Sequence, residues 1–362
     1  MKNIIINLIN ANQGAHLIRS KNFLLNLKKI DQINRYFILS ENDLNIFHNK
    51  FKYKIFKISK NKFISIIQRI FIQHFLINYY YFKYNISIYI NFSHTVPIFS
   101  LKKIFKIIAV TNVAPLVKFE NFLFSQKIKM FFLKYKILFS CILSNRIISI
   151  SDYCKVLLEK NNINSKKIFV IKNGINEFTQ SRSNNNNKFF LYVSHFYRYK
   201  NFENLINSYS KLPKQILDKY KLIIIGNPYD LPYYNFIKRK IIDLNMEKNI
   251  EIHSNLSREK IDQYIKECYL FIFPSLIENC PMSILEAIQF NKPILTSNIP
   301  PMNEFCKDLP LYFDPHDQNS IMNSIIEFCK NNEISSSYDY SLIKKQLTWE
   351  KFTKRILSMY IV

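Results

Sequence analysis

Two glutamates in the last third of the chain have the spacing and the setting to bind a sugar nucleotide. The segment Phe271–Ala287 reads as a buried strand, a loop containing Glu278, and a helix with Pro281 in its first turn. Glu286 then lies about one and a half turns into that helix. A helix start attracts phosphate, and a carboxylate can accept two hydrogen bonds from ribose hydroxyls. The segment therefore predicts a nucleoside diphosphate site, although two solvated surface glutamates would give the same sequence.

The chain has only three glycines, so each one marks a position where a side chain is hard to accommodate. Gly14 follows the first apolar strand and Gly226 ends another, which are the places where open α/β sheets bind ligands. Gly174 follows an asparagine, as in a common turn. We expect an ordinary turn at Gly174 and a tight strand exit at Gly226. Gly14 is either a donor-binding residue or a turn residue.

Short apolar strands that alternate with helical patterns must position these residues. Strands are expected at 3–9, 36–39, 86–90, 107–110, 147–150, 189–193, 222–225, 250–253, 270–273 and 293–296. Such alternation predicts parallel sheets that are covered by helices. The expected fold class is therefore α/β, with two Rossmann-like doubly wound domains.

The domain boundaries follow from a change in composition. Residues 181–188 contain no apolar side chain, which predicts a linker. We therefore expect an acceptor-binding domain at 1–180 and a nucleotide-sugar-binding domain at 189–345. A last helix at 346–362 is expected to pack back on the N-terminal domain.

The chain is strongly basic, with 51 Lys and Arg against 26 Asp and Glu and a net charge of +25. A basic face can bind nucleic acid, but no nucleic-acid motif is present, and we expect no such partner. A composition biased toward Ile, Lys, Asn, Phe and Tyr also explains the charge, and we favour this explanation. An anionic membrane surface would also attract it. The segments Phe51–Phe82 and Lys102–Tyr135 interleave Lys with aromatic residues, as interfacial helices or ordinary amphipathic helices do.

The cysteines and the apolar runs indicate the compartment. Six cysteines occur singly, without a Cys-x-x-Cys pair, which favours neither zinc nor disulfides and fits a reducing cytosol. The first residues have too short an apolar run for a signal peptide, and charges interrupt the apolar region 63–92. We expect a cytoplasmic protein that is either soluble or in peripheral contact with anionic lipid at the inner face of the membrane.

The pair Glu278 and Glu286, in a Pro-Ser…Pro…Leu-Glu-Ala frame, resembles the paired-glutamate motif of retaining glycosyltransferases of family 4, within the glycosyl transferases group 1. Segments similar to others of this family follow in the expected order at 147–153, 173–174, 191–201 and 300–315. The resemblance covers about residues 100–320, and the first hundred only through the Gly14 loop. It implies the GT-B fold, in which two Rossmann-like domains face each other across a cleft.

The resemblance also implies roles for individual residues. Glu286 would hold the ribose hydroxyls, and Glu278 would face the donor sugar together with the backbone of Asn279, Cys280 and Pro281. Lys200 would neutralise the diphosphate leaving group. Glu278 and Lys200 are thus the expected catalytic residues.

Three positions depart from the family pattern. Ser194-His195 replaces a frequent Gly-Arg, so a second diphosphate cation is missing, and Arg198 is the candidate replacement. Asn279 stands where glycine is common. Thr111 stands where many relatives have a histidine that precedes Asn-x-Ala-Pro. His16 and His94 are candidates for that imidazole, although a lone histidine more often packs in the core or on the surface.

The implied reaction moves a hexose-type sugar from a nucleoside diphosphate to an acceptor hydroxyl with retained anomeric configuration. Fixed cations and amide dipoles would stabilise the leaving diphosphate. No Asp-x-Asp pair occurs, and we expect no metal and no cofactor besides the donor. The acceptor would be a glycan or lipid-linked glycan, as in bacterial surface polysaccharide or lipopolysaccharide synthesis. The alternative is an inactive nucleotide-sugar-binding protein on the same scaffold.

Overall fold

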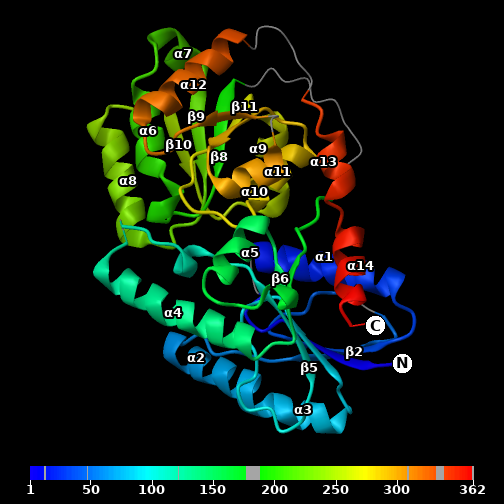
Figure 1. Cartoon of the computed structure of the whole chain (residues 1–362). Helices are drawn as coiled ribbons and strands as arrows, with labels where there is room; N and C mark the ends of the chain where they lie inside the picture. The colour runs from blue at the N-terminus through cyan, green and yellow to red at the C-terminus, as the bar shows by residue number, and fades with distance from the viewer. Residues whose placement is uncertain are drawn as a thin grey trace. The chain divides into compact units, whose positions relative to one another are not determined.

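The structure is a computed structural model that describes residues 1–11, 14–46, 48–120, 122–176, 188–307, 310–331 and 338–360. These residues form two compact α/β units (Figure 1). Unit 1 comprises Met1–Lys118, Phe124–Gly174 and Leu347–Val362, and unit 2 comprises Phe119–Leu123 and Ile175–Gln346. The expected linker at 181–188 lies outside the described residues except for Lys188.

Unit 1 contains a seven-stranded parallel sheet with the order β3-β2-β1-β4-β5-β6-β7. Its strands are β1 (Asn3–Asn7), β2 (Arg35–Ser40), β3 (Phe51–Ile55), β4 (Ile88–Asn91), β5 (Phe105–Val110), β6 (Arg146–Ser149) and β7 (Ile168–Val170). Its α-helices are α1 (Gly14–Ile30), α2 (Lys62–Phe71), α3 (Ile77–Lys83), α4 (Phe124–Ile142), α5 (Asp152–Glu159) and α14 (Trp349–Ser358), and a π-helical turn, η1 (Ile72–Leu76), joins α2 to α3. Figure 1 shows α2, α3 and α4 on the side of this sheet away from α1 and α14.

Unit 2 contains a six-stranded parallel sheet with the order β10-β9-β8-β11-β12-β13. Its strands are β8 (Phe189–Val193), β9 (Lys221–Ile225), β10 (Ile250–His253), β11 (Leu270–Phe273), β12 (Ile294–Ser297) and β13 (Leu311–Phe313). Its α-helices are α6 (Phe202–Ser210), α7 (Lys214–Lys219), α8 (Leu231–Asp243), α9 (Arg258–Glu267), α10 (Met282–Gln289), α11 (Pro300–Cys306), α12 (Gln318–Asn331) and α13 (Ser341–Gln346). In Figure 1, α6 and α8 lie to the left of these strands, and α9 and α10 lie to the right.

Both sheets confirm the expected doubly wound architecture. In each sheet, the strands that follow the first strand are added on one side of it, and the later strands are added on the other side. The strand order therefore reverses between β1 and β4 in unit 1 and between β8 and β11 in unit 2. Loops at the carboxyl ends of such paired strands diverge, which opens a ligand site at the switch point. Strand β11, at the centre of the unit 2 sheet, is apolar and buried throughout, as expected for a strand that helices cover on both faces.

Three strands differ from the sequence expectation. Strand β3 occupies the start of segment 51–82, for which we expected an interfacial helix, because Phe-Lys-Tyr-Lys-Ile alternates with a period of two and extends the sheet beside β2. Strands β7 and β13 are only three residues long, so they carried too little apolar signal to be predicted.

The last helix, α14, packs on α1 within unit 1. The rings of Phe23 and Phe352 meet with their centroids 6.4 Å apart. A Cβ on Gly174 would lie 2.3 Å from the backbone nitrogen of Trp349. Gly174 is therefore required by the close approach of the C-terminal segment, rather than by the turn that we expected.

Among the described residues, no helix has both the length and the apolar character needed to cross a bilayer. All six cysteines have free thiols. The part of the chain that the structure describes contains no cluster of three or more His, Cys, Asp or Glu side chains suited to a metal ion.

Candidate functional site

Lys200 and Glu278 meet at the switch point of unit 2. Lys200 ends the loop that follows β8, and Glu278 lies in the loop that follows β11, so adjacent central strands supply the two residues. Lys200 Nζ forms an ion pair with Glu278 Oε1, and the two side chains are 15% and 9% exposed. The sheet thus places two residues that are far apart in the sequence side by side, where they form a largely buried ion pair.

Asn201 fixes the loop that carries Lys200. It adopts a left-handed conformation with φ of 60°, and its Nδ2 donates to the carbonyl oxygens of Pro274 (3.0 Å) and Pro315 (2.7 Å). The hydroxyl of Tyr192 donates to the Lys200 carbonyl oxygen at 2.7 Å. One asparagine therefore ties together the loops after β8, β11 and β13. Sequence patterns alone indicate no role for Asn201 beyond its place after Lys200.

Glu286 is buried in α10, and its partner is an arginine that the sequence did not indicate. Arg258, the first residue of α9, donates from Nη1 to Glu286 Oε1 at 2.6 Å and from Nη2 to Asp262 Oδ1 at 2.6 Å. Burial raises the pKa of Glu286, and the charge of Arg258 opposes this increase. Within the described part of the chain, Oε2 accepts no hydrogen bond, which leaves one carboxylate oxygen for another donor.

The residues between the two glutamates form the entry to α10. Asn279 and Cys280 are buried, and Pro281 occupies the N-cap position before Met282. The buried face of this helix consists of the expected apolar residues, including Ile284 and Ile288. The first turn of α10 therefore directly follows the loop that carries Glu278.

His195 and Arg198 lie in the loop after β8, where we expect a second cation for the diphosphate, and Arg198 remains the candidate for it. Burial, and then the nearby Lys200, lower the pKa of His195, and its Nδ1 accepts a hydrogen bond from the Asn227 amide at 3.2 Å. Arg198 lies with its guanidinium carbon 5.1 Å from the ring centroid of Tyr233 in α8. Neither side chain contacts Glu278 or Glu286 in the described ranges.

Gly226 has the structural role that we expected. A Cβ at this position would lie 1.8 Å from the carbonyl oxygen of Ser194, so only glycine fits where β9 ends against the loop after β8.

In unit 1, Gly14 and His16 lie at the start of α1. Gly14 has a positive φ of 58° with open space around the missing Cβ, so backbone conformation rather than crowding favours glycine. His16 Nε2 lies 2.8 Å from Thr111 Oγ1, just after β5. The imidazole of α1 thus reaches the position at which many relatives, by the resemblance above, have a histidine.

Arg19, Asn173 and His94 add further polar groups to unit 1. Arg19 Nε donates to Asn173 Oδ1 at 2.8 Å. Burial is the main cause that lowers the pKa of His16 to about 3, and the charges of Arg19 and His94 lower it further. Burial and Lys136 lower the pKa of His94 to about 4. Both imidazoles are therefore uncharged at neutral pH.

The chain is similar to known glycosyltransferases. Residues 175–345 match the family model of the glycosyl transferases group 1. The O-antigen chain mannosyltransferase RfbU of Salmonella typhimurium is 26% identical over 264 residues, which are 70% of this chain and 70% of that protein. The O-antigen chain mannosyltransferase B of Escherichia coli is 25% identical over 175 residues, which are 47% of this chain and 45% of that protein.

Solved structures share the fold over nearly the whole chain. Sucrose-phosphate synthase from Thermosynechococcus elongatus has a TM-score of 0.77 at 13% identity, covering 99% of this chain and 98% of its own. HepE of Anabaena in complex with UDP-glucose has a TM-score of 0.76 at 11% identity, covering 99% of both chains. The fold is that of the GT-B glycosyltransferases, and together with the family match it supports a group 1 glycosyltransferase.

Proposed function

We propose that this protein transfers a sugar from a nucleoside diphosphate sugar to an acceptor hydroxyl with retention of anomeric configuration, as expected for family 4. The observation that carries the proposal is the set of four charged residues around the switch point of unit 2. Lys200 and Glu278 pair there, and Glu286 is buried beside Arg258 on the helix that the Glu278 loop enters.

Each of these residues has a defined task in the proposed reaction. Lys200 has three N–H donors, so it can hold Glu278 and still donate to a phosphate oxygen of the leaving diphosphate. Glu278, with the backbone of Asn279, Cys280 and Pro281, faces the donor sugar. The free Oε2 of Glu286 accepts hydrogen bonds from the ribose hydroxyls, while Arg258 keeps the carboxylate charged.

In unit 1, the proposed contacts to the donor and acceptor come from the loop that follows β1. Gly14 leaves open space at the start of α1, and the neutral His16 is held by Thr111. A neutral imidazole can donate one hydrogen bond and accept another, which suits sugar hydroxyls. We assign His16, rather than His94, to that contact.

The proposed pathway is the synthesis of a bacterial surface polysaccharide or lipopolysaccharide. Similar proteins are named O-antigen chain mannosyltransferases, and one is named a capsular polysaccharide biosynthesis glycosyltransferase of Staphylococcus aureus. The acceptor is accordingly a glycan or a lipid-linked glycan at the cytoplasmic face of the membrane. A mannosyl nucleotide is the first donor to test, and UDP-glucose is the second.

The test is incubation of the purified full chain with a panel of nucleotide sugars and a lipid-linked glycan fraction. Release of nucleoside diphosphate, together with a glycosylated product whose new linkage keeps the donor's anomeric configuration, is the expected result. Binding without release at any acceptor would instead favour the inactive nucleotide-sugar-binding protein. An inverted linkage would overturn the assignment to a retaining enzyme.

A further inference from the structure

Helix α2 of unit 1 has its apolar face turned outward. Phe63, Ile67 and Phe71 have exposed fractions of 73%, 50% and 55%, whereas Ser65 is buried at 6%. An ordinary surface helix buries its apolar face and exposes its polar face. The orientation of α2 is the reverse, so its apolar face is available to a partner.

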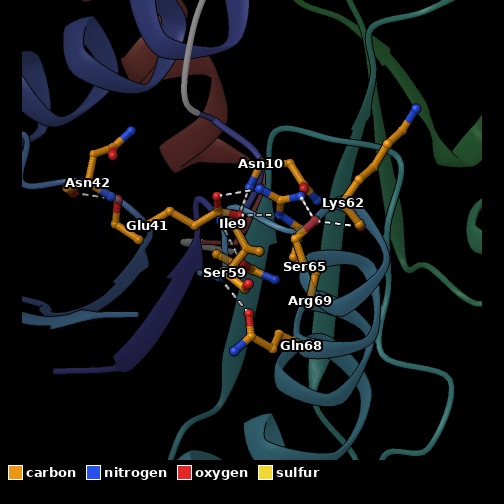
Figure 2. A network of polar contacts seen from close by, with 11 residues as sticks. Ile9, Asn10, Glu41, Asn42, Ser59, Lys62, Ser65, Gln68 and Arg69 are labelled. Carbon is orange, nitrogen blue, oxygen red and sulfur yellow. Dashed lines mark hydrogen bonds and ion pairs between the residues drawn. The ribbon is translucent and has the colours of Figure 1, made fainter. Parts of the chain in front are cut away.

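Polar contacts hold α2 in this orientation. Arg69 donates from Nε to Glu41 Oε1 and from Nη2 to Glu41 Oε2, both at 2.8 Å, and the Glu41 side chain is only 5% exposed (Figure 2). Gln68 Oε1 accepts from the Ser59 amide at 2.8 Å, and Asn61 caps the helix start. Specific hydrogen bonds thus hold the polar side of α2 against the rest of unit 1, and this fixes the direction of its apolar side.

The same Glu41 carboxylate connects α2 to the loop that follows β1. Glu41 Oε1 accepts a hydrogen bond from the Asn10 amide at 3.0 Å (Figure 2). Asn10 precedes the segment that leads to Gly14. A single ion pair therefore attaches the outward-facing helix to the loop in which we place substrate contacts.

Neighbouring helices also expose aromatic side chains. Figure 1 shows α2, α3 and α4 on the same side of the sheet of unit 1. Burial lowers the pKa of His74 in η1, and the charge of Lys136 in α4 lowers it further. The exposed aromatic residues of this region include Phe75, Tyr79 and Phe82 of η1 and α3, and Phe124, Phe131 and Phe132 of α4. We call the outward faces of α2, η1, α3 and α4 the docking surface.

The segment that contains this surface is almost free of acidic side chains, so its net charge is strongly positive. Residues 44–151, under a third of the chain, contain 17 of the 51 Lys and Arg but only Glu120 of the 26 Asp and Glu. This segment has a net charge of +16, and the rest of the chain has +9. A uniform compositional bias would spread the excess evenly, so it does not explain this distribution.

We propose that the docking surface binds the surface of an anionic lipid bilayer, with its aromatic and aliphatic side chains among the acyl chains and its lysines at the headgroups. Exposed apolar residues flanked by Lys are the pattern of interfacial helices. A second copy of the chain would bring two strongly basic faces together, which like-charge repulsion opposes. Nucleic acid would pair with the lysines but would not bury the exposed isoleucines of α2.

The experiment is sedimentation of the full chain with vesicles of phosphatidylcholine alone or mixed with phosphatidylglycerol. We expect binding to the mixed vesicles and much weaker binding to neutral ones. Phe63→Ser/Ile67→Ser/Phe71→Ser should lower the partition coefficient by about tenfold or more, because three apolar contacts with lipid are lost. Lys127→Gln/Lys129→Gln should lower it by roughly fivefold per lysine, and only on anionic vesicles.

The matched control is Leu231→Ser/Phe236→Ser/Ile242→Ser, which removes three exposed apolar residues from α8 of unit 2. This variant should bind vesicles as the wild type does. Binding to neither kind of vesicle would overturn the proposal, and so would an equal loss of binding in both triple variants. A dimer in size-exclusion chromatography that Phe63→Ser/Ile67→Ser/Phe71→Ser converts to a monomer would also overturn it. Retention by RNA without retention by vesicles would do the same. No donor or acceptor is used, so the outcome is independent of the proposed transfer reaction.

Discussion

Glu286 forms a buried ion pair with Arg258 and, in the proposed donor complex, accepts hydrogen bonds from the ribose. Glu286→Gln keeps the side-chain shape but removes the charge, which should cost about 1.5–3 kcal/mol of donor binding, or roughly tenfold to more than a hundredfold in turnover. Titration with donor and steady-state kinetics measure this loss. Asp262→Asn is the control, because it perturbs Arg258 without touching Glu286. Equal losses in the two variants would mean that the ion pair matters only for folding.

The pair of Lys200 and Glu278 can be separated into structural and catalytic parts. Lys200→Met leaves Glu278 largely buried without its partner, which should lower the free energy of unfolding by about 1–3 kcal/mol. It should also reduce turnover, because the leaving diphosphate loses its cation. The double variant Lys200→Met/Glu278→Gln should regain stability but not turnover. Denaturant unfolding and kinetics on the same samples check both parts, and recovered turnover would contradict the catalytic role.

The lowered pKa values of His16 and His94 predict a loss of stability in mild acid. Their pKa values are lowered to about 3 and about 4, so below the usual pKa near 6.5 the unfolded chain binds protons that the folded chain does not. The free energy of unfolding should fall as the pH drops from about 6.5 toward 4, by about 1.4 kcal/mol per pH unit for each histidine.

Urea unfolding of the wild type and of His16→Gln between pH 4.5 and pH 7 tests this dependence. The variant should have a shallower slope, because one of the two proton-binding differences is removed. Parallel slopes would show that His16 is not held neutral by burial.

At the scale of elements, the loop after β8 depends on Asn201. Asn201→Gly keeps the residue's freedom to adopt a positive φ but removes both side-chain hydrogen bonds, so we expect a loss of about 1–3 kcal/mol in stability. Donor affinity should fall as well, because Lys200 loses its fixed loop. Thermal melts with and without donor measure the two effects. Unchanged donor affinity in a destabilised variant would limit Asn201 to a structural role.

The elements that the sequence predicted best are those with continuous apolar runs. Strands β8 and β11 lie at the expected residues because each is a compact apolar run that polar residues flank. Arg258 could not be found in the same way, because its pairing with Glu286 depends on how α9 packs against α10. Likewise, Asn201 acts through carbonyl oxygens more than 70 residues away along the chain.

For the whole molecule, the order of strand–helix alternation was enough to predict two doubly wound units. The scarcity of acidic residues in 44–151 could also be read from the sequence. The direction in which α2 faces could not, because periodicity defines an apolar face but not whether that face points inward. The ion pair of Glu41 with Arg69 decides this direction, and the two residues are 28 positions apart.

The most direct test of donor binding is a thermal shift of the full chain with nucleotide sugars. A ligand that binds only the folded state raises the melting temperature. We predict that at least one nucleoside diphosphate sugar raises the melting temperature of the wild type by several degrees and that of Glu286→Gln by much less. A melting temperature that no nucleotide sugar changes, or an equal rise in both proteins, would contradict the assignment of Glu286 to the donor.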